Sequence, residues 1–334
     1  MLSRIADALF WMSRYYERAE NTARLIDVNI NRMLDMGYLM EEADSGARYW
    51  EPIIRITSPL QEFRRHYPTT TQDAAIEWLT YSADNPHSIL ACIRHARENA
   101  LRIRGRITSE MWEQLNTTYL RVRETNLDQI HREGASAYFL RIRRASQLFQ
   151  GMFASTLPRD EALQWIMLGL LLERADATTR LLDVKYHILL PSVEDVGGPI
   201  DNVQWLAVLK SCSAAEAFQR RYVARITPSR VAEFLVLDQA FPRSVRFCFD
   251  QIGLSLRSVA LEHGTPDEQP PEMVATHVRH KLSETTISNI IQFGLHQYLL
   301  QLQDHCAEIS QEISQAYFQA RSSSDTVSAQ NRSL

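Results

Sequence analysis

The sequence has little glycine and proline, with 11 and 12 residues of each in a chain of 334. Such sparse helix breakers favour long helices over a turn-rich β fold. Long apolar runs are also missing, since the most apolar one, residues 165–172, is far shorter than the roughly 20 residues of a membrane-spanning helix. Asp7 and Arg14 interrupt the apolar start, so no signal-peptide core forms. We expect an all-α cytoplasmic protein without a membrane segment.

Familiar catalytic and nucleotide-binding motifs are missing as well. The chain has no GxGxxG, no Walker A loop, no Gly-x-Ser-x-Gly elbow and no CxxC pair. Its four cysteines are far apart in apolar stretches, which favours buried, reduced thiols. They are Cys92, Cys212, Cys248 and Cys306. No self-contained ATP site or nucleophilic catalytic set is predicted.

Lysine is rare, with only three among the 36 basic residues. A GC-rich genome would explain the excess of arginine, and so would a need for forked recognition of carboxylate or phosphate. The composition does not separate these two explanations. The net charge of −4 predicts no general attraction to nucleic acid or to an anionic membrane.

The chain repeats itself at an offset of 156 residues. Segments 17–28 and 173–184 are identical at eight of twelve positions. The same offset pairs further residues, namely Pro86 with Pro242, Ser88 with Ser244 and Cys92 with Cys248. This pattern indicates a tandem duplication rather than a short-period solenoid. We expect a multi-helix bundle of two related halves, 1–156 and 157–320, intertwined about a pseudo-two-fold axis, followed by a disordered tail, 321–334.

Apolar periodicity and breakers predict the individual helices. The expected ranges are 2–35, 48–65, 71–82, 86–104, 108–131, 134–155, 159–190, 199–222, 228–240, 242–260 and 272–318. Breaks are expected at prolines such as Pro52, Pro68 and Pro158.

Each repeated segment carries a charged stripe on one side of a predicted helix. The stripes are Glu17, Glu20, Arg24 and Asp27 in the first segment and Glu173, Asp176, Arg180 and Asp183 in the second. One interpretation is a solvent-facing row of ion pairs. Leucines surround the second segment on nearly every side, however, which is typical of an interior helix whose charges are paired or line a cavity. Both interpretations, an exposed stripe and a buried or cleft-facing cluster, stay open.

The segment 96–112 has no counterpart in the second half. Residues 94–144 hold eleven arginines and only six acidic residues. Thr108 or Ser109 is suited to cap a following helix, with Glu110 in its first turn. The segment is either an anion site built in one half only or a solvated helix that turns a corner at Gly105.

A metal site is not expected. A di-iron bundle needs paired Glu-x-x-His motifs, but Glu17 is followed three residues later by Glu20 and Glu173 by Asp176. The histidines near the end of the chain are scattered along predicted helices.

Three motifs together resemble the alpha-E family, which is named for a helical domain with a Glu-Arg signature. They are Glu17-Arg18-Ala19-Glu20 with Arg24, the block from Ala96 to Trp112, and Glu173-Arg174-Ala175-Asp176 with Arg180. The resemblance covers nearly the whole chain except the tail. It implies a circularly permuted ATP-grasp protein as partner and a role in ATP-dependent amide or peptide-bond formation. ATP and Mg would then be bound by that partner, and no cofactor by this chain alone.

Two functions follow as hypotheses. The chain is a helical accessory or substrate-binding subunit of an ATP-grasp-type ligase system, or it is a non-catalytic scaffold whose Glu/Arg pairs hold the halves together. No catalytic residue is assigned. A peptide or amino-acid substrate would be bound by the following candidates: Glu17, Arg18, Glu20, Arg24, Glu98, Asn99, Arg102, Arg106, Glu110, Glu173, Arg174, Arg180 and Asp183.

Overall fold

The computed structural model describes residues 1–37, 45–187, 198–223, 226–264 and 269–319. Within these ranges the chain forms sixteen α-helices and no β-strand, which confirms the all-α class. None of the helices in the described part is both long and apolar enough to cross a membrane. The tail predicted to be disordered lies outside the described residues.

The helices fall into two series of eight. The first series is α1 (Ser3–Gly37), α2 (Ser45–Thr57), α3 (Leu60–His66), α4 (Gln72–Thr80), α5 (Ile89–Arg102), α6 (Ser109–Arg123), α7 (Leu127–Glu133) and α8 (Ala135–Thr156). The second series is α9 (Glu161–His187), α10 (Pro199–Ser211), α11 (Ala215–Arg221), α12 (Pro228–Leu237), α13 (Val245–His263), α14 (Pro270–Glu284), α15 (Ile287–Phe293) and α16 (Leu295–Ile313). A 3₁₀ turn, Arg104–Arg106, follows α5, and a π-helical turn, Ser314–Phe318, follows α16.

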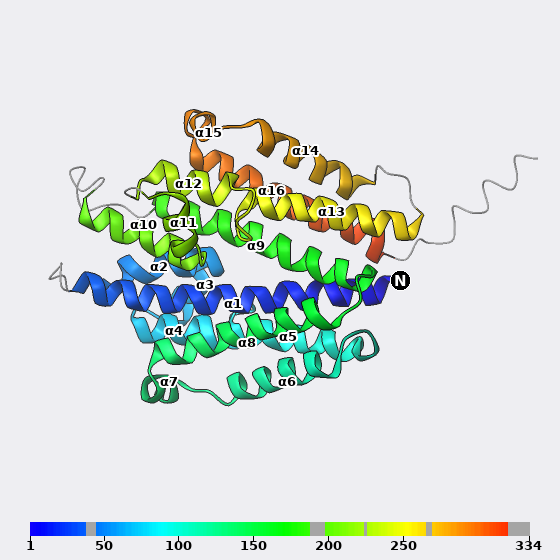
Figure 1. The fold of residues 1–334 in the computed structure, drawn as a ribbon. Coiled ribbons are helices and arrows are strands. Elements are labelled where there is room, and N and C mark those ends of the chain that lie inside the picture. The colour runs from blue at the N-terminus through cyan, green and yellow to red at the C-terminus, as the bar shows by residue number, and fades with distance from the viewer. Residues whose placement is uncertain (38–44, 188–197, 224–225, 265–268, 320–334) are drawn as a thin grey trace, which may run out of the picture.

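The two longest helices, α1 and α9, pack against each other in the middle of the molecule (Figure 1). Helix α1 packs on α5 and α8, and α9 packs on α13 and α16. The series also exchange contacts, because α10 touches α1 and α2 touches α9. Helices α4 to α8 of the first series lie on one side of this central pair and most of the second series on the other (Figure 1).

Local signals recur between the two series. Ser88 and Ser244 cap the starts of α5 and α13, each side chain accepting a backbone N–H three residues on. Gly134 and Gly294 both have positive φ, which glycine tolerates best, and join α7 to α8 and α15 to α16. Such recurrence is what a tandem duplication would leave, and the duplication with its boundary near residue 156 stays an inference from these pairs.

Several predicted boundaries were wrong. Pro52 lies inside α2 and does not end it, and the predicted helix 48–65 instead divides at Ser58-Pro59. The predicted helices 108–131, 199–222 and 272–318 are each interrupted as well, by turns at 124–126, 212–214 and 285–286. These turns are closed by side-chain caps or by polar residues, which the apolar periodicity does not reveal.

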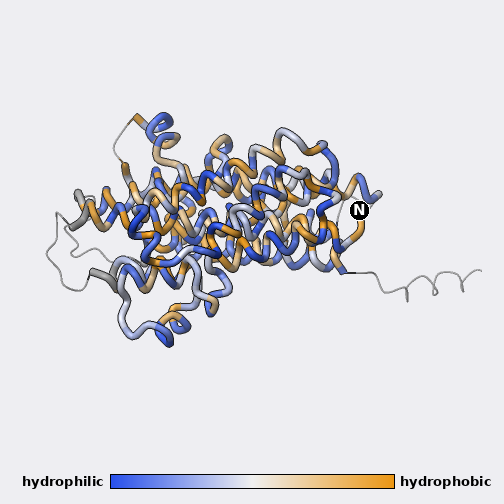
Figure 2. Tube along the Cα trace, turned by 90° about the horizontal axis from the view of Figure 1, so that it is seen from below, coloured by the Kyte–Doolittle hydropathy of each residue, from blue (hydrophilic) through white to orange (hydrophobic). Residues whose placement is uncertain are grey.

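The core is continuous from end to end of the bundle. Trp50, Trp78 and Trp165 are buried, with Phe10 and Phe149 among the other large side chains that fill it. Apolar and polar residues intermingle along most of the helices (Figure 2), as packing with one side towards the core requires. The close approach of α1 and α9 depends on Gly169, because a Cβ there would collide with the backbone oxygen of Phe10.

Candidate functional site

The charged stripes of both repeated segments lie inside the bundle. In α1, Glu17, Glu20 and Arg24 are at most 2% exposed, and in α9 Glu173 is 4% exposed. The interpretation of a solvent-facing stripe is therefore wrong for these residues. Arg180, near the rim, differs because its side chain is 44% exposed.

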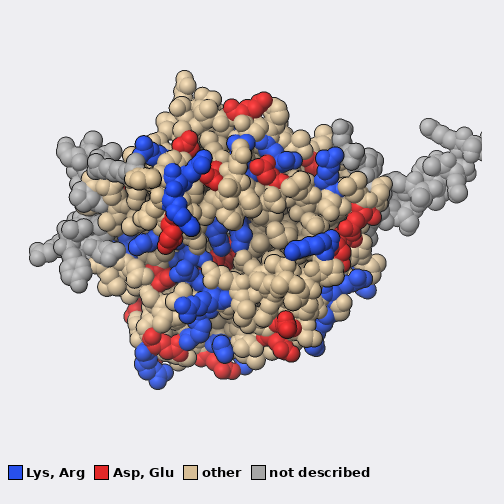
Figure 3. All heavy atoms as spheres, viewed as in Figure 1, with Lys and Arg blue, Asp and Glu red and all other residues tan. Residues whose placement is uncertain are grey.

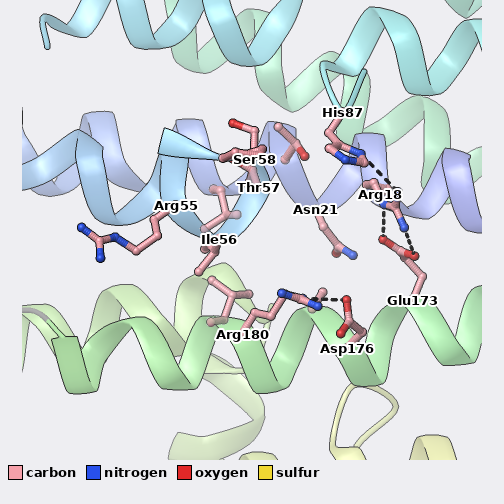
Figure 4. A pocket seen from close by; sticks show the side chains of 15 residues that line it. Arg18, Asn21, Arg55, Ile56, Thr57, Ser58, His87, Glu173, Asp176 and Arg180 are labelled. Atoms are coloured by element: carbon pink, nitrogen blue, oxygen red, sulfur yellow. Dashed lines mark hydrogen bonds and ion pairs between the residues drawn. The ribbon is translucent and has the colours of Figure 1, made fainter. Parts of the chain in front are cut away.

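Two Glu-Arg dipeptides pair reciprocally where α1 meets α9. Arg18 donates from Nε to Oε1 of Glu173 at 2.6 Å and from Nη2 to Oε2 at 2.9 Å (Figure 4). Arg174 donates from Nε to Oε1 of Glu17 at 2.9 Å. The first contact is a two-pronged fork, the geometry in which guanidinium and carboxylate bind most strongly. The glutamate of each dipeptide thus binds the arginine of the other, and the two series are joined at their centre.

One side of this crossing is closed by Arg243, from the start of the second-series segment that leads into α13. Its Nη1 lies 2.9 Å from Oε1 of Glu17, and its Nη2 donates to Oε2 of Glu20 at 2.9 Å. Nη1 also donates to Oδ1 of Asn21 at 2.9 Å. Gln150 of α8 completes the shell by donating to Glu17 at 2.9 Å and accepting from Arg174 at 2.7 Å. Every carboxylate oxygen here is held, so this side is a filled ion-pair network.

The pKa values follow from this pairing. Burial raises the pKa of Glu173, but the charges and hydrogen bonds of Arg18 and Arg14 outweigh it and lower the pKa to about 2. Burial likewise opposes ionisation of Glu20, yet Arg243 and Arg24 keep its pKa below the ordinary value. Both carboxylates are therefore charged at neutral pH.

The other side of the crossing is open. A cavity of about 390 Å³ lies between α1, the end of α2 and α9. Figure 4 shows its lining: Asn21 and Arg18 reach in from α1, His87 lies at one end, and Asp176 and Arg180 rise from α9. Arg55 from α2 lies at the rim, with its guanidinium turned outward (Figure 4). We call this cavity the signature cleft.

His87 lies at one end of the signature cleft (Figure 4). Its Nδ1 lies 3.4 Å from Nη1 of Arg18, and because a guanidinium only donates, Nδ1 accepts and the ring proton sits on Nε2. Burial, with the charge of Arg18, lowers the pKa of His87. The imidazole is consequently neutral at pH 7 and offers an N–H donor.

The predicted candidates divide into two groups. Those that the structure brings together at the crossing are Glu17, Arg18, Glu20, Arg24, Glu173, Arg174 and Arg180. Asp183 lies further along α9 and pairs with Nδ1 of His296 at 2.6 Å, linking α9 to α16. Asp27 similarly pairs with Arg143 of α8 at 2.7 Å.

The unduplicated segment lies apart from the crossing. Its candidates Glu98, Arg102, Arg106 and Glu110 are exposed, Asn99 is half-buried, and none of them lines the signature cleft. The structure therefore does not bring this segment together with the signature helices, because the end of α5, the 3₁₀ turn and the start of α6 place these side chains at the surface.

The segment instead forms an arginine–aromatic surface at the corner between α5 and α6. Arg97 donates to Asn116 at 2.7 Å, and its guanidinium lies 5.4 Å from the ring of Trp112. Arg104 covers the same ring at 4.9 Å. Thr108 caps α6 as predicted, and the corner predicted at Gly105 is the 3₁₀ turn.

Four residues of the crossing were missed by the sequence reasoning. Arg14 lies one helical turn before Arg18 and donates to Glu173 at 3.1 Å. Asn21, His87 and Arg243 complete the two sides. The sequence repeat did point to His87 and Arg243. They directly follow the matched prolines Pro86 and Pro242, so they occupy equivalent positions of the repeat with different side chains.

Other features carry less chemistry. A larger hollow of about 710 Å³ lies between α6, α7 and α8, and none of the residues that line it belongs to the Glu-Arg segments.

Within the described residues, no group of three or more His, Cys, Asp or Glu could hold a metal ion. All four cysteines are buried and free, as expected. Basic and acidic side chains are interspersed on the face seen in Figure 3.

Fold and crossing together define an all-helical protein whose two central helices are joined by reciprocal Glu–Arg pairs. The model of the Alpha-E family, described as a predicted alpha-helical domain with a conserved ER motif, matches residues 1–318, and the chain belongs to this family. The dipeptides at 17–18 and 173–174 fit that description.

Curated relatives are distant and much longer. Uncharacterized proteins of Mycobacterium bovis and Mycobacterium tuberculosis are each 22% identical to this chain over 289 residues. The alignment covers 81% of this chain but 31% of each relative, so the chain spans about a third of their length. No solved structure shows significant similarity to it.

Proposed function

We propose that this protein is the helical, substrate-binding subunit of an ATP-grasp-type amide or peptide ligase system. The observation that carries the proposal is the signature cleft, where both Glu-Arg helices meet around a cavity of about 390 Å³. That volume lies within the range of small-molecule sites, and Asn21, Arg180 and His87 supply a few polar groups in it. An amino acid or a short peptide is the proposed substrate.

The partner follows from the family resemblance and from chain length. A circularly permuted ATP-grasp protein would bind ATP and Mg, activate a carboxylate as an acyl phosphate and let an amine displace the phosphate. This chain would contribute binding and orientation. The alignment with this chain covers about a third of the length of the relatives, which supports a domain that acts together with other domains. The system would operate in the cytoplasm, where ATP is available.

The scaffold hypothesis is favoured by a different observation. The reciprocal pairs Arg18–Glu173 and Arg174–Glu17 connect the two series at buried positions. Breaking such a pair leaves an uncompensated buried charge, which costs about 3–5 kcal/mol. We therefore assign the reciprocal pairs to the framework and the cleft beside them to binding, so that the two hypotheses describe different residues.

Reconstitution with the cognate ATP-grasp protein tests the proposal. The measurements are ADP release and amide product, with and without this chain. We expect product formation to need the chain, to fall strongly with Arg180→Gln in the cleft, and to be unchanged by Arg257→Gln at an exposed position of α13. Equal ligation without the chain would remove the basis of the proposal.

A further inference from the structure

The repeat offset places the two sides of the α1–α9 crossing in correspondence. The pairs are Glu17 with Glu173, Glu20 with Asp176, Arg24 with Arg180, Asn21 with Ala177, and Arg243 with His87. The same i,i+4 ion pair occurs in both helices, as Glu20 with Arg24 in α1 and as Asp176 with Arg180 in α9. The two sides share a framework and differ in the residue that reaches between the acids.

Arg243 fills its side, whereas His87 leaves the corresponding space empty. The guanidinium of Arg243 binds Glu17, Glu20 and Asn21, and its side chain is only 12% exposed. The shorter His87 stops at Arg18, and Asp176 is one methylene shorter than Glu20. The signature cleft is the space that this difference opens.

Both acids that line the cleft are already paired with arginines of the crossing. Both oxygens of Glu173 are taken, by two N–H groups of Arg18 and one of Arg14. Asp176 accepts from Nε of Arg180 at 2.8 Å. A second guanidinium, the group that fills the other side, would therefore find no free carboxylate pair here.

Spare donors, by contrast, face the cleft. Asn21 is 6% exposed, its Oδ1 is occupied by Arg243, and its Nδ2 has no partner while the side chain extends from α1 towards α9 (Figure 4). A buried donor left unpaired costs about 1–3 kcal/mol, so a bound acceptor would relieve it. Nε2–H of His87 and the outer N–H groups of Arg180 complete the donor set.

The charge balance indicates the class of acceptor. The charged groups that line the cleft are Arg18, Arg55, Arg180, Glu173 and Asp176, and together they carry one net positive charge. One surplus charge with two neutral donors suits a singly charged carboxylate better than a doubly charged phosphate, whose second charge would stay uncompensated.

From this geometry we infer that the signature cleft is a single carboxylate-binding site, and that the corresponding site on the other side of the crossing is permanently occupied by Arg243. The carboxylate would accept from Nδ2 of Asn21, Nε2 of His87 and the guanidinium of Arg180. This inference rests on the proposed function in treating the cleft as a binding site, but it does not depend on the ligase partner.

Ligand-observed NMR titration of the purified chain tests it, with N-acetylglycine, its neutral analogue N-acetylglycinamide and inorganic phosphate as probes over the millimolar range. We expect saturable binding of N-acetylglycine, with the amide and phosphate about tenfold weaker or more. Arg180→Gln should weaken N-acetylglycine binding by about tenfold, the scale of one charge-assisted hydrogen bond.

His87→Leu is the second variant, because it removes the Nε2–H donor at the end of the cleft without adding charge. We expect it to weaken N-acetylglycine binding by about fivefold, the scale of one neutral hydrogen bond, while thermal melting shows a folded protein, and Arg257→Gln to bind as the wild type does. If His87→Leu does not fold, Arg180→Gln decides, since the Arg180 side chain is 44% exposed.

Equal binding of acid and amide, tighter binding of phosphate, or no saturable binding would each overturn the carboxylate site. Carboxylate binding without any effect of the chain on ligation would instead leave this inference standing and overturn the proposed function.

Discussion

The two sides of the α1–α9 crossing are built from matching residues but end in different states. On the closed side, Arg243 ties Glu17 and Glu20 together with little exposure to solvent. On the open side, His87 stops short, Arg180 is 44% exposed and a cavity remains. Three residue differences at equivalent positions thus separate a structural ion-pair network from a candidate binding site, namely Arg243 against His87, Glu20 against Asp176 and Asn21 against Ala177.

This comparison shows why the Glu-Arg signature alone does not reveal a role. The same i,i+4 pair is buried in α1 and half-exposed in α9, so its energetic value differs although its chemistry is the same. What surrounds the pair, and not the pair itself, decides whether it stabilises the fold or lines a cleft.

The largest expected effect is on the closed side. Glu17→Gln removes the buried counter-charge of Arg174 and one of the two that Arg243 binds, and it should lower the free energy of unfolding by about 3–5 kcal/mol. Urea denaturation measures it. The matched control is Glu98→Gln, whose carboxylate is 49% exposed beside His95 and whose loss should cost about 0.5 kcal/mol or less. Similar losses in both variants would contradict a buried network.

A second prediction concerns pH. The pKa of Glu173 falls from 4.5 to about 2 on folding, so its stabilising contribution is complete above about pH 4.5 and is lost as the pH falls towards 2. The difference in unfolding free energy between wild type and Glu173→Gln should therefore shrink by about 3 kcal/mol across that window. A difference that stays constant from pH 6 to pH 2.5 would show that Arg18 and Arg14 do not hold this carboxylate.

The packing of the crossing gives a third test. Gly169→Ala introduces a Cβ against the backbone of Phe10 and should destabilise the protein by about 1–3 kcal/mol. Gly151→Ala in α8 meets no atom within 4 Å and should instead stabilise it by up to about 1 kcal/mol. Thermal melting of both variants is sufficient, and a neutral Gly169→Ala would mean that α1 and α9 are further apart.

The smallest effect is expected on the open side. Asp176→Asn removes one acid of an i,i+4 pair whose arginine is 44% exposed, and the loss should stay below about 1 kcal/mol. Glu20→Gln, at the corresponding buried position, should cost several times more. Equal losses from these two variants would remove the distinction between a closed and an open side.

Much of the local structure could be predicted from the sequence. The all-α class, the cap at Thr108 and the corner at Gly105 follow from sparse breakers, a short polar side chain before a helix and a flexible residue between two helices. The leucines around 173–184 correctly indicated an interior helix, because apolar residues on all sides of a helix need burial on all sides.

Other boundaries and the composition of the site could not be predicted. Pro52 is tolerated within α2 although proline commonly ends helices. Arg102 at the end of α5 and Arg106 in the 3₁₀ turn are both exposed, although their spacing allowed a site. Arg243 was missed because it lies 223 residues from its partner Glu20, and no helical periodicity relates positions so far apart.

The sequence by itself determined that two Glu-Arg helices exist and that their neighbours repeat, since helix periodicity, caps and repeats depend on residues close together along the chain or on comparison of the chain with itself. Only the tertiary structure decided that Glu17 binds Arg174, that Glu173 binds Arg18, and that one side of their crossing is filled while the other is open. The physical reason is that the contribution of a charged side chain to stability or to binding depends on its burial and its partners. Both are set by the packing of helices that are distant in the sequence.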